Sequence, residues 1–467
     1  MAPALGGIKL RAMSVGNRQF EGDLYYASSL SETVDWSAMR HIDADWVEQA
    51  LATTGTASLR KRRLPAEQIL WLVIGMAMVR SAPIEDVVAQ LDLVLPGSGA
   101  RPRVAKSTIA QGRARLGAQP LKWLFEKTAT KWAHGRARTD HWRDLALYGV
   151  DGTTLRVPDS EANREHFGLA GGGDRGLSGY PMVRASALVA LRSHLVAAAS
   201  FGPFAQGEHS YSKSLWGQVP DHSVTVVDRN FAHPKVLLPL SRSGEQRHWL
   251  TRARANTKWE VIKRFGTKDV LVRINVGKDA RRNDPLLPES FECRAIAYSH
   301  GGRESSWLLT SLVEHSLYPR TELVDLYHER WEHELAYDEL KTEMLLSEES
   351  LRSKTVEGVK QEIWGILLAY NTIRLEMAAV ADEAELSPTR ISFAHSLRHM
   401  LLEWVAYGHA SPGALPKRVR RFREDLKAWI LPPRRSARSY PRAVKRKMSK
   451  FPKKRRPGEE LEEEPPK

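Results

Sequence analysis

The chain has 467 residues, enough for several domains, and its 42% hydrophobic and 27% charged residues are typical of ordinary globular proteins. This composition excludes wholesale disorder and a protein with many membrane spans. The net charge is +15, and the single cysteine, Cys293, excludes an intramolecular disulfide bond and a thiolate metal cluster. The amino-terminal residues lack the pattern of an export signal, so we expect a cytoplasmic location.

Residues 1–142 are predicted to be helical, because apolar residues recur there at helical spacing behind capping residues. Two short helices are expected over 84–93 and 107–116, with a loop rich in Pro and Gly between them. The second of these carries Gln111 and Arg113. It is either the recognition helix of a helix-turn-helix-like DNA-binding unit or an ordinary surface helix.

From residue 143 the pattern changes to short apolar runs that are typical of strands. The run 145–150 ends in Asp151, and the run 224–227 ends in Asp228. Carboxylates at the ends of adjacent strands can together hold hard cations such as Mg²⁺. Because an aspartate after a strand also favours a turn, a turn is the alternative role of each aspartate taken alone.

Strand-like runs continue to about residue 312, and helical periodicity resumes at Thr321. The predicted fold class is therefore α/β, a core with a β-strand-rich insertion and helical flanking regions. Its predicted parts are a helical amino-terminal domain (1–142), the first part of the core (143–238), the β-rich insertion (239–312), the second part of the core (313–375), a helical carboxyl-terminal region (376–415) and a tail (416–467).

The tail holds most of the positive charge. Residues 417–456 carry 18 Lys or Arg against two acidic residues, whereas residues 457–467 have a net charge of −4. The first 416 residues are left with only +3. We therefore expect a flexible basic tail that binds a polyanion, with the acidic run 459–464 able to shield it.

The most specific signal lies on the predicted helix 327–341. At about 100° per residue, four side chains fall within an arc of roughly 60°: Tyr327, Arg330, Glu334 and Lys341. This arrangement, two cationic side chains and a phenol beside one carboxylate, is suited to a metal-binding glutamate whose neighbours bind phosphates. The alternative is a charged amphipathic helix with an Arg330–Glu334 pair.

This pattern resembles the signature of the cut-and-paste bacterial DDE transposases of the insertion-sequence-four family. In that signature Tyr, Arg, Glu and Lys are separated by two, three and six residues, and this chain matches it without a gap. Residues 150–154 and 227–231 resemble the blocks around the family's two aspartates, although Asn230 stands where members usually have Gly. The resemblance covers about residues 20–410, without the basic tail.

The resemblance implies a ribonuclease-H-like core in which Asp151, Asp228 and Glu334 are the catalytic residues and bind two Mg²⁺ ions, which Mn²⁺ could replace. One ion would activate the nucleophile, first water and then the freed 3′-hydroxyl, and the other would stabilise the leaving oxygen. We expect the three carboxylates to converge to within several Å, a metal-bridging distance.

The resemblance also implies the partners. Tyr327, Arg330 and Lys341 would contact phosphates of double-stranded DNA, at the terminal inverted repeats and the target. A homodimer would pair the two ends, in the bacterial cytoplasm at the nucleoid. An aromatic residue of the insertion would hold a flipped base, and the candidates, each with core packing as its alternative role, are Trp249, Trp259 and Trp307.

Other acidic residues could serve in place of Glu334, and on the same predicted helix they are Glu329, Glu332, Asp338 and Glu339. Glu208 lies where the family often has an acidic residue, and we assign it no catalytic role. The predicted function is a DNA transposase that moves an insertion sequence. The alternatives are a catalytically silent DNA-binding derivative and a metal-dependent ribonuclease-H-like DNA nuclease.

Overall fold

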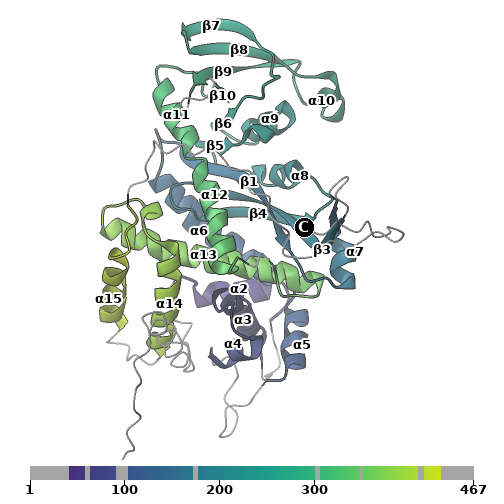
Figure 1. The fold of residues 1–467 in the computed structure, drawn as a ribbon, viewed down its shortest axis with the longest axis vertical. Coiled ribbons are helices and arrows are strands. Elements are labelled where there is room, and N and C mark those ends of the chain that lie inside the picture. The colour runs from purple at the N-terminus through teal and green to yellow at the C-terminus, as the bar shows by residue number, and fades with distance from the viewer. Residues whose placement is uncertain are drawn as a thin grey trace, which may run out of the picture.

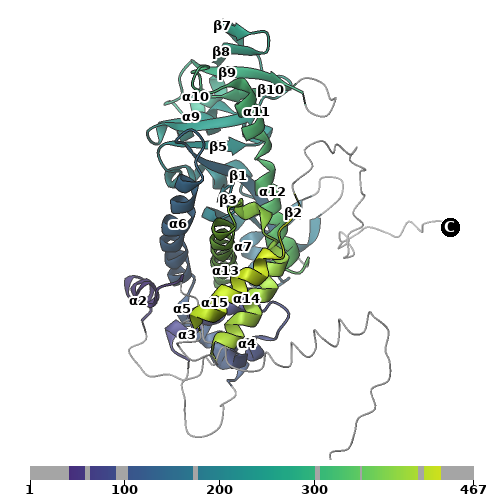
Figure 2. The same ribbon diagram turned by 90° about the vertical axis from the view of Figure 1, so that its left-hand side faces the viewer.

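A computed structural model describes residues 41–57, 64–90, 104–171, 177–299, 306–347, 350–408 and 415–432. A mixed sheet runs through the upper part of the elongated molecule, and helices gather at the other end (Figure 1). Helices also cover both faces of the sheet (Figure 2). Residues 1–40 and 433–467 lie outside the described residues, so the structure does not address most of the predicted basic tail.

The core of the sheet has the strand order β4–β3–β1–β5–β6. Strands β1, β5 and β6 are parallel to one another, whereas β3 is antiparallel to both β1 and β4. This order confirms the predicted ribonuclease-H-like fold. The strands are β1 (Ala146–Arg156), β2 (Leu169–Gly171), β3 (Leu177–Ala190), β4 (Val196–Pro203), β5 (Ser223–Val227) and β6 (Arg247–Arg252).

The strands of the predicted insertion extend this sheet. Strand β10 (Ser306–Thr310) pairs with β6, and the order continues through β9 (Ser290–Tyr298) and β8 (Asp269–Asn275) to β7 (Glu260–Gly266). Strand β6 falls within the predicted insertion but pairs with β5 in the core. The insertion and the core therefore share one sheet of ten strands.

Alternating residues of β1 pack into two different hydrophobic cores, as expected for a strand buried on both faces. Tyr148 and Val150 pack on the side of helix α9 (Pro234–Arg242), whereas Leu147 packs with helix α11 (Arg320–His328). Strand β5 is buried along its whole length and consists mostly of β-branched residues, which favour a buried strand.

The longest helix, α13 (Val356–Glu383), begins at Thr355, whose side chain accepts a hydrogen bond from the Gly358 amide. Among the described residues it is the one helix long and apolar enough to cross a membrane. However, 83% of the most apolar window of α13 is buried inside the protein, and α13 packs against the amino-terminal helices. Its apolar composition is therefore that of a helix in the protein core.

The remaining helices surround α13 and the sheet. They are α2 (Ala44–Thr53), α3 (Ala66–Met78), α4 (Ile84–Gln90), α5 (Lys106–Leu116), α6 (Gln119–Thr139), α7 (Glu161–Phe167), α8 (Glu208–Lys213), α10 (Lys278–Asn283), α12 (Trp331–Asp338), α14 (Phe393–Gly408) and α15 (Leu415–Lys427). Helix α15 lies within the predicted tail, yet Phe422 and Leu426 are buried and the helix contacts α13 and α14.

Arg113, on the candidate recognition helix α5, points toward α13. Its Nε donates to Gln361 at 3.1 Å, and its Nη2 donates to Ser353 and to the Gly358 carbonyl oxygen. Arg113 therefore binds another helix of the same chain. The residues that α5 exposes for a partner include Gln111 and Arg115.

Candidate active site

Asp151 and Asp228 lie beside each other at one edge of the parallel strands. Val150 of β1 is the register partner of Val227 of β5, and each aspartate is the next residue of its chain segment. Parallel neighbours in register bring their carboxyl ends to the same place. The two strand-end aspartates identified in the sequence are therefore adjacent in the fold.

Hydrogen bonds fix the backbone at Asp151. The hydroxyl groups of Tyr337 and Ser186 donate to the Asp151 carbonyl oxygen at 2.9 and 3.0 Å. The Asp151 carboxylate accepts a hydrogen bond from the Gly152 amide at 2.8 Å through Oδ1. Because Tyr337 belongs to helix α12 (Trp331–Asp338), this contact also ties that helix to the strand end.

Asp228 caps a 3-10 turn formed by residues 229–231. Its carboxylate accepts from the Asn230 amide, and Thr251 of β6 donates to its carbonyl oxygen at 2.9 Å. Asn230 is outside the left-handed backbone region, so this turn does not require glycine. The carbonyl oxygen of Asn230 accepts from Arg254 at 2.8 Å, which links the turn to the chain that follows β6.

The predicted helix 327–341 is divided into three segments. Helix α11 ends at His328, α12 spans Trp331–Asp338, and a π-helical turn, η5, covers Glu339–Met344. Gly149 of β1 allows α12 to approach closely, since a Cβ atom there would lie 3.2 Å from the ring of His333 and 2.6 Å from Leu191. Glu334 follows His333 on α12, the helix that packs over β1, which also carries Asp151.

Arg330 holds the Glu334 carboxylate in an ion pair at 2.8 Å. Burial acts against the charge of Arg330, but the nearby Tyr327, Glu334 and Asp151 outweigh it, and the pKa of Arg330 is raised. Arg330 is therefore close to both Asp151 and Glu334, and it occupies the Glu334 carboxylate. The pair is the one expected for a charged amphipathic helix, and it lies at the candidate site.

Within the described part of the chain, no group of three or more His, Cys, Asp or Glu side chains is close enough to hold a metal ion together. The three predicted ligands therefore do not form a closed metal cluster here. Their chemistry nevertheless fits a hard cation, because the two aspartates are neighbours and a further carboxylate is near them. The third predicted ligand, Glu334, is paired with Arg330.

The further carboxylate is Glu208, for which the sequence predicts no catalytic role. Its side chain lies against Gly152, where a Cβ atom would be 2.2 Å from Glu208 Oε1. Burial raises the pKa of Glu208, and repulsion from Asp151 and Asp228 raises it further. Such crowding of negative charge is what a bound cation relieves. In the sequence, Glu208 is the first residue of a short polar helix, and the signal that singles it out is its position, where the family often has an acidic residue.

The three predicted DNA-binding residues lie on separate segments. Tyr327 is on α11, partly buried against Tyr298 with 6.0 Å between ring centroids, and burial raises its pKa to about 12. Arg330 is at the break between α11 and α12, and Lys341 is on the π-helical turn. Tyr327 and Arg330 are close enough to interact electrostatically.

The tryptophan candidates differ in exposure. Trp249 is only 1% exposed and packs in the core of the sheet. Trp259 and Trp307 are partly buried and meet edge to face, with 5.7 Å between ring centroids. Core packing therefore accounts for Trp249, and a ligand could reach only the latter pair.

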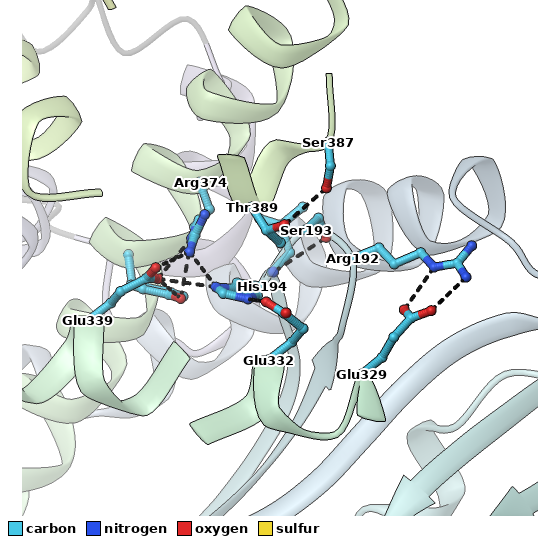
Figure 3. A network of polar contacts seen from close by, with 11 residues as sticks. Arg192, Ser193, His194, Glu329, Glu332, Glu339, Arg374, Ser387 and Thr389 are labelled. Atoms are coloured by element: carbon cyan, nitrogen blue, oxygen red, sulfur yellow. Dashed lines mark hydrogen bonds and ion pairs between the residues drawn. The ribbon is translucent and has the colours of Figure 1, made fainter. Parts of the chain in front are cut away.

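Three of the other acidic residues of the predicted helix point away from the strand ends. Glu329, Glu332 and Glu339 face the β3–β4 turn and α13, where basic side chains bind them (Figure 3). Asp338 is exposed and accepts a hydrogen bond from Thr342 at 2.9 Å. These contacts leave Glu334 as the carboxylate of this helix that shares a neighbour, Arg330, with Asp151.

Comparisons with known proteins agree with these observations. Residues 37–126 match the family described as insertion element 4 transposase N-terminal, and residues 144–372 match the transposase DDE domain. The chain is 36% identical over 414 residues to the transposase InsG for insertion sequence element IS4 of Escherichia coli K12, covering 88% of this chain and 92% of that protein. It is 35% identical over 222 residues to the putative transposase InsZ of the same strain, covering 48% of this chain and 73% of that protein.

Among solved structures, a cryo-EM structure of the piggyBac transposase synaptic complex with hairpin DNA matches with a TM-score of 0.37 and 11% identity. The match covers 87% of this chain and 85% of that chain.

Proposed function

Since the chain belongs to the insertion element 4 family of DDE transposases, we propose that it cuts and pastes its own insertion sequence by phosphoryl transfer at the terminal inverted repeats. Within the family we assign it to the subgroup with the Tyr-Arg-Glu-Lys signature. The observation that carries the proposal is the pairing of Asp151 with Asp228 at adjacent strand ends, beneath the helix of Glu334.

Asp151, Asp228 and Glu334 would hold two divalent cations. When bound, such ions supply a polarised nucleophile and stabilise the charge on the leaving oxygen. The protein's own contribution is to fix the carboxylates. Tyr337 and Ser186 hold the backbone of Asp151, Thr251 holds that of Asp228, and the close contact at Gly149 sets the distance of α12.

We assign Arg330 a double role. In the absence of DNA it neutralises Glu334, and on binding DNA its guanidinium would turn to a backbone phosphate, for which its planar donors are well suited. Tyr327 and Lys341 would contact the same strand on either side. The partners are then terminal-repeat and target DNA in the bacterial cytoplasm, and a second copy of the chain, because two ends must be paired.

Cleavage and joining by the wild-type chain test the proposal. With Mg²⁺, the full chain should cut a labelled duplex at its element's terminal repeat and join the freed 3′-hydroxyl to a target duplex. Chelation of the metal should abolish both products, because the carboxylates position cations and are not themselves the acid and base. Denaturing gels of the labelled strands measure both steps.

Each other outcome favours one alternative. Cleavage without joining would indicate a metal-dependent nuclease. Binding of the repeat without cleavage would indicate a silent DNA-binding derivative. Cleavage that persists in a chelator would contradict a metal-dependent mechanism altogether.

The basic residues beyond the described chain should act as a nonspecific DNA clamp. Because α15 is packed on α13 and α14, the tail is best removed after Pro432, which leaves Phe422 and Leu426 in place. Removal of residues 433–467 should weaken binding to terminal-repeat and unrelated DNA equally. The slope of log affinity against log salt should become shallower by about 0.9 for each phosphate that the chain no longer neutralises.

The matched control removes only residues 457–467, which carry a net charge of −4. If this acidic run shields the basic tail, its removal should strengthen DNA binding. A salt slope that stays the same after removal of residues 433–467 would disprove the clamp. Filter binding or fluorescence anisotropy over a salt series gives the slopes.

A further inference from the structure

Three carboxylates that the proposed chemistry does not use form the opposite side of the Glu334 segment. Glu329 and Glu332 point to the turn between β3 and β4, and Glu339 points to α13 and to His194 of that turn, as Figure 3 shows. At about 100° per residue, Glu332 lies about 160° from Glu334 around the helix, and Glu339 about 140°. Contacts on this side therefore fix the direction in which Glu334 points.

Each carboxylate binds a basic side chain. Arg192 donates two hydrogen bonds to Glu329, at 2.8 and 2.9 Å, and His194 Nε2 lies 2.8 Å from Glu332. These two contacts join the β3–β4 turn to the residues on both sides of the α11–α12 break. Helix α12 has eight residues and follows α11 after only two residues, Glu329 and Arg330, so these contacts act on both helices where they meet.

Glu339 has the densest set of contacts. Arg374 of α13 donates to it from Nε at 3.0 Å and from Nη2, and the Tyr370 hydroxyl donates to it at 2.8 Å. His194 Nδ1 lies within hydrogen-bond distance of Arg374 and 3.4 Å from Glu339. Glu339 is also the first residue of the π-helical turn η5, so these contacts act where α12 ends.

These groups are nearly removed from water. The side chains of His194 and Arg374 are each 1% exposed, that of Glu339 is 19% exposed, and Tyr370 is fully buried. His194 adopts a left-handed backbone conformation, with φ of 61°, which is unfavourable for a residue with a side chain. Burial opposes the charge of Glu339, but attraction to Arg374 and His194 lowers its pKa to about 2.

Buried ion pairs add little net stability, and in some proteins they specify one arrangement of the elements that they join. The elements joined here are the end of α12, helix α13 and the β3–β4 turn. Resting on the proposed function, we propose that Glu339, held by Arg374, Tyr370 and His194, is a positioning residue that sets the rotation of α12 and so directs Glu334 toward Asp151 and Asp228.

The test replaces Glu339 by Gln and measures metal binding as well as activity. Glu339→Gln keeps the shape of the side chain but removes the charge that Arg374 binds. With the full chain on its terminal-repeat DNA, Mn²⁺ affinity measured by electron paramagnetic resonance should fall about 10-fold, within the range typical of supporting groups behind metal ligands. The Mg²⁺ concentration at half-maximal cleavage should rise by the same factor, with affinity for the DNA end unchanged.

The matched control is Glu362→Gln. Glu362 is also a buried glutamate bound by an arginine, Arg80, and it lies on the same α13 as Arg374. This variant should lose stability to a similar degree without any change in Mn²⁺ affinity. Tyr370→Phe, which removes one hydrogen bond to Glu339, is a milder variant and should shift Mn²⁺ affinity about twofold in the same direction.

The results separate the two proposals. Wild-type Mn²⁺ affinity in both Glu339→Gln and Tyr370→Phe would overturn the positioning role. An equal loss of Mn²⁺ affinity in Glu362→Gln would also overturn it, because the effect would then follow from lower stability alone. A wild-type chain that neither binds Mn²⁺ nor cuts its own ends would instead overturn the proposed function, and the positioning role with it.

Discussion

Replacing Glu334 by Gln should abolish cleavage and strand transfer while binding to the terminal repeats persists. Glutamine has nearly the same shape but cannot supply the negative charge that a hard cation requires. If one metal ligand contributes several kcal/mol to the stabilisation of charge in the transition state, its loss lowers the rate on the order of 10³-fold. Binding should persist because Arg330, freed from its 2.8 Å ion pair with Glu334, remains available to phosphates.

Asp338→Asn is the matched control on the same helix. By helical spacing Asp338 shares the face of Glu334, but its carboxylate is exposed and accepts a hydrogen bond from Thr342. This variant should cut and join at the wild-type rate, measured on labelled duplexes under the same Mg²⁺ conditions. A loss of products in Asp338→Asn together with normal products in Glu334→Gln would transfer the role of third carboxylate to Asp338.

The sequence is sufficient to predict the part of the site that depends on strands. Asp151 and Asp228 each come directly after a run of apolar residues, and parallel pairing of two such runs places their carboxyl-terminal neighbours side by side. The alternation of strand-like and helical segments also predicts the α/β class, because it depends on local composition and short-range periodicity, which a single sequence contains. The ribonuclease-H-like form of that fold is implied by the family resemblance.

Other features depend on contacts between distant residues. The pattern 327–341 predicts one continuous helix, yet the chain breaks before Trp331 and widens into a π-helical turn from Glu339. At both places a side chain from outside the segment binds it, Arg192 at Glu329 and Arg374 at Glu339, and the pattern 327–341 does not contain these partners. The position of Glu208 likewise depends on the absence of a side chain at Gly152, and the spacing of residues in the sequence does not predict such a contact.

Replacing Arg374 by Met should cause the largest loss of stability among the variants considered. It leaves Glu339 charged and largely buried without its main cation, and breaking a buried ion pair in this way costs about 3–5 kcal/mol. The urea midpoint at pH 7 should therefore fall markedly. The double variant Arg374→Met/Glu339→Met should recover a large part of this loss, because it removes the unpaired charge as well.

The dependence on pH gives this prediction a second, independent measurement. Despite burial, attraction to Arg374 and His194 lowers the pKa of Glu339 from its ordinary value of 4.5 to about 2, so the unfolded chain binds the proton more readily than the folded one. The stabilisation from the pair is then complete above pH 4.5 and is lost as the pH falls toward 2. The difference in urea midpoint between the wild type and Arg374→Met should accordingly be full at pH 7 and narrower at pH 3. A difference that is as large at pH 3 as at pH 7 would mean that Arg374 stabilises the fold through packing, and that the charge of Glu339 does not hold α12 in place.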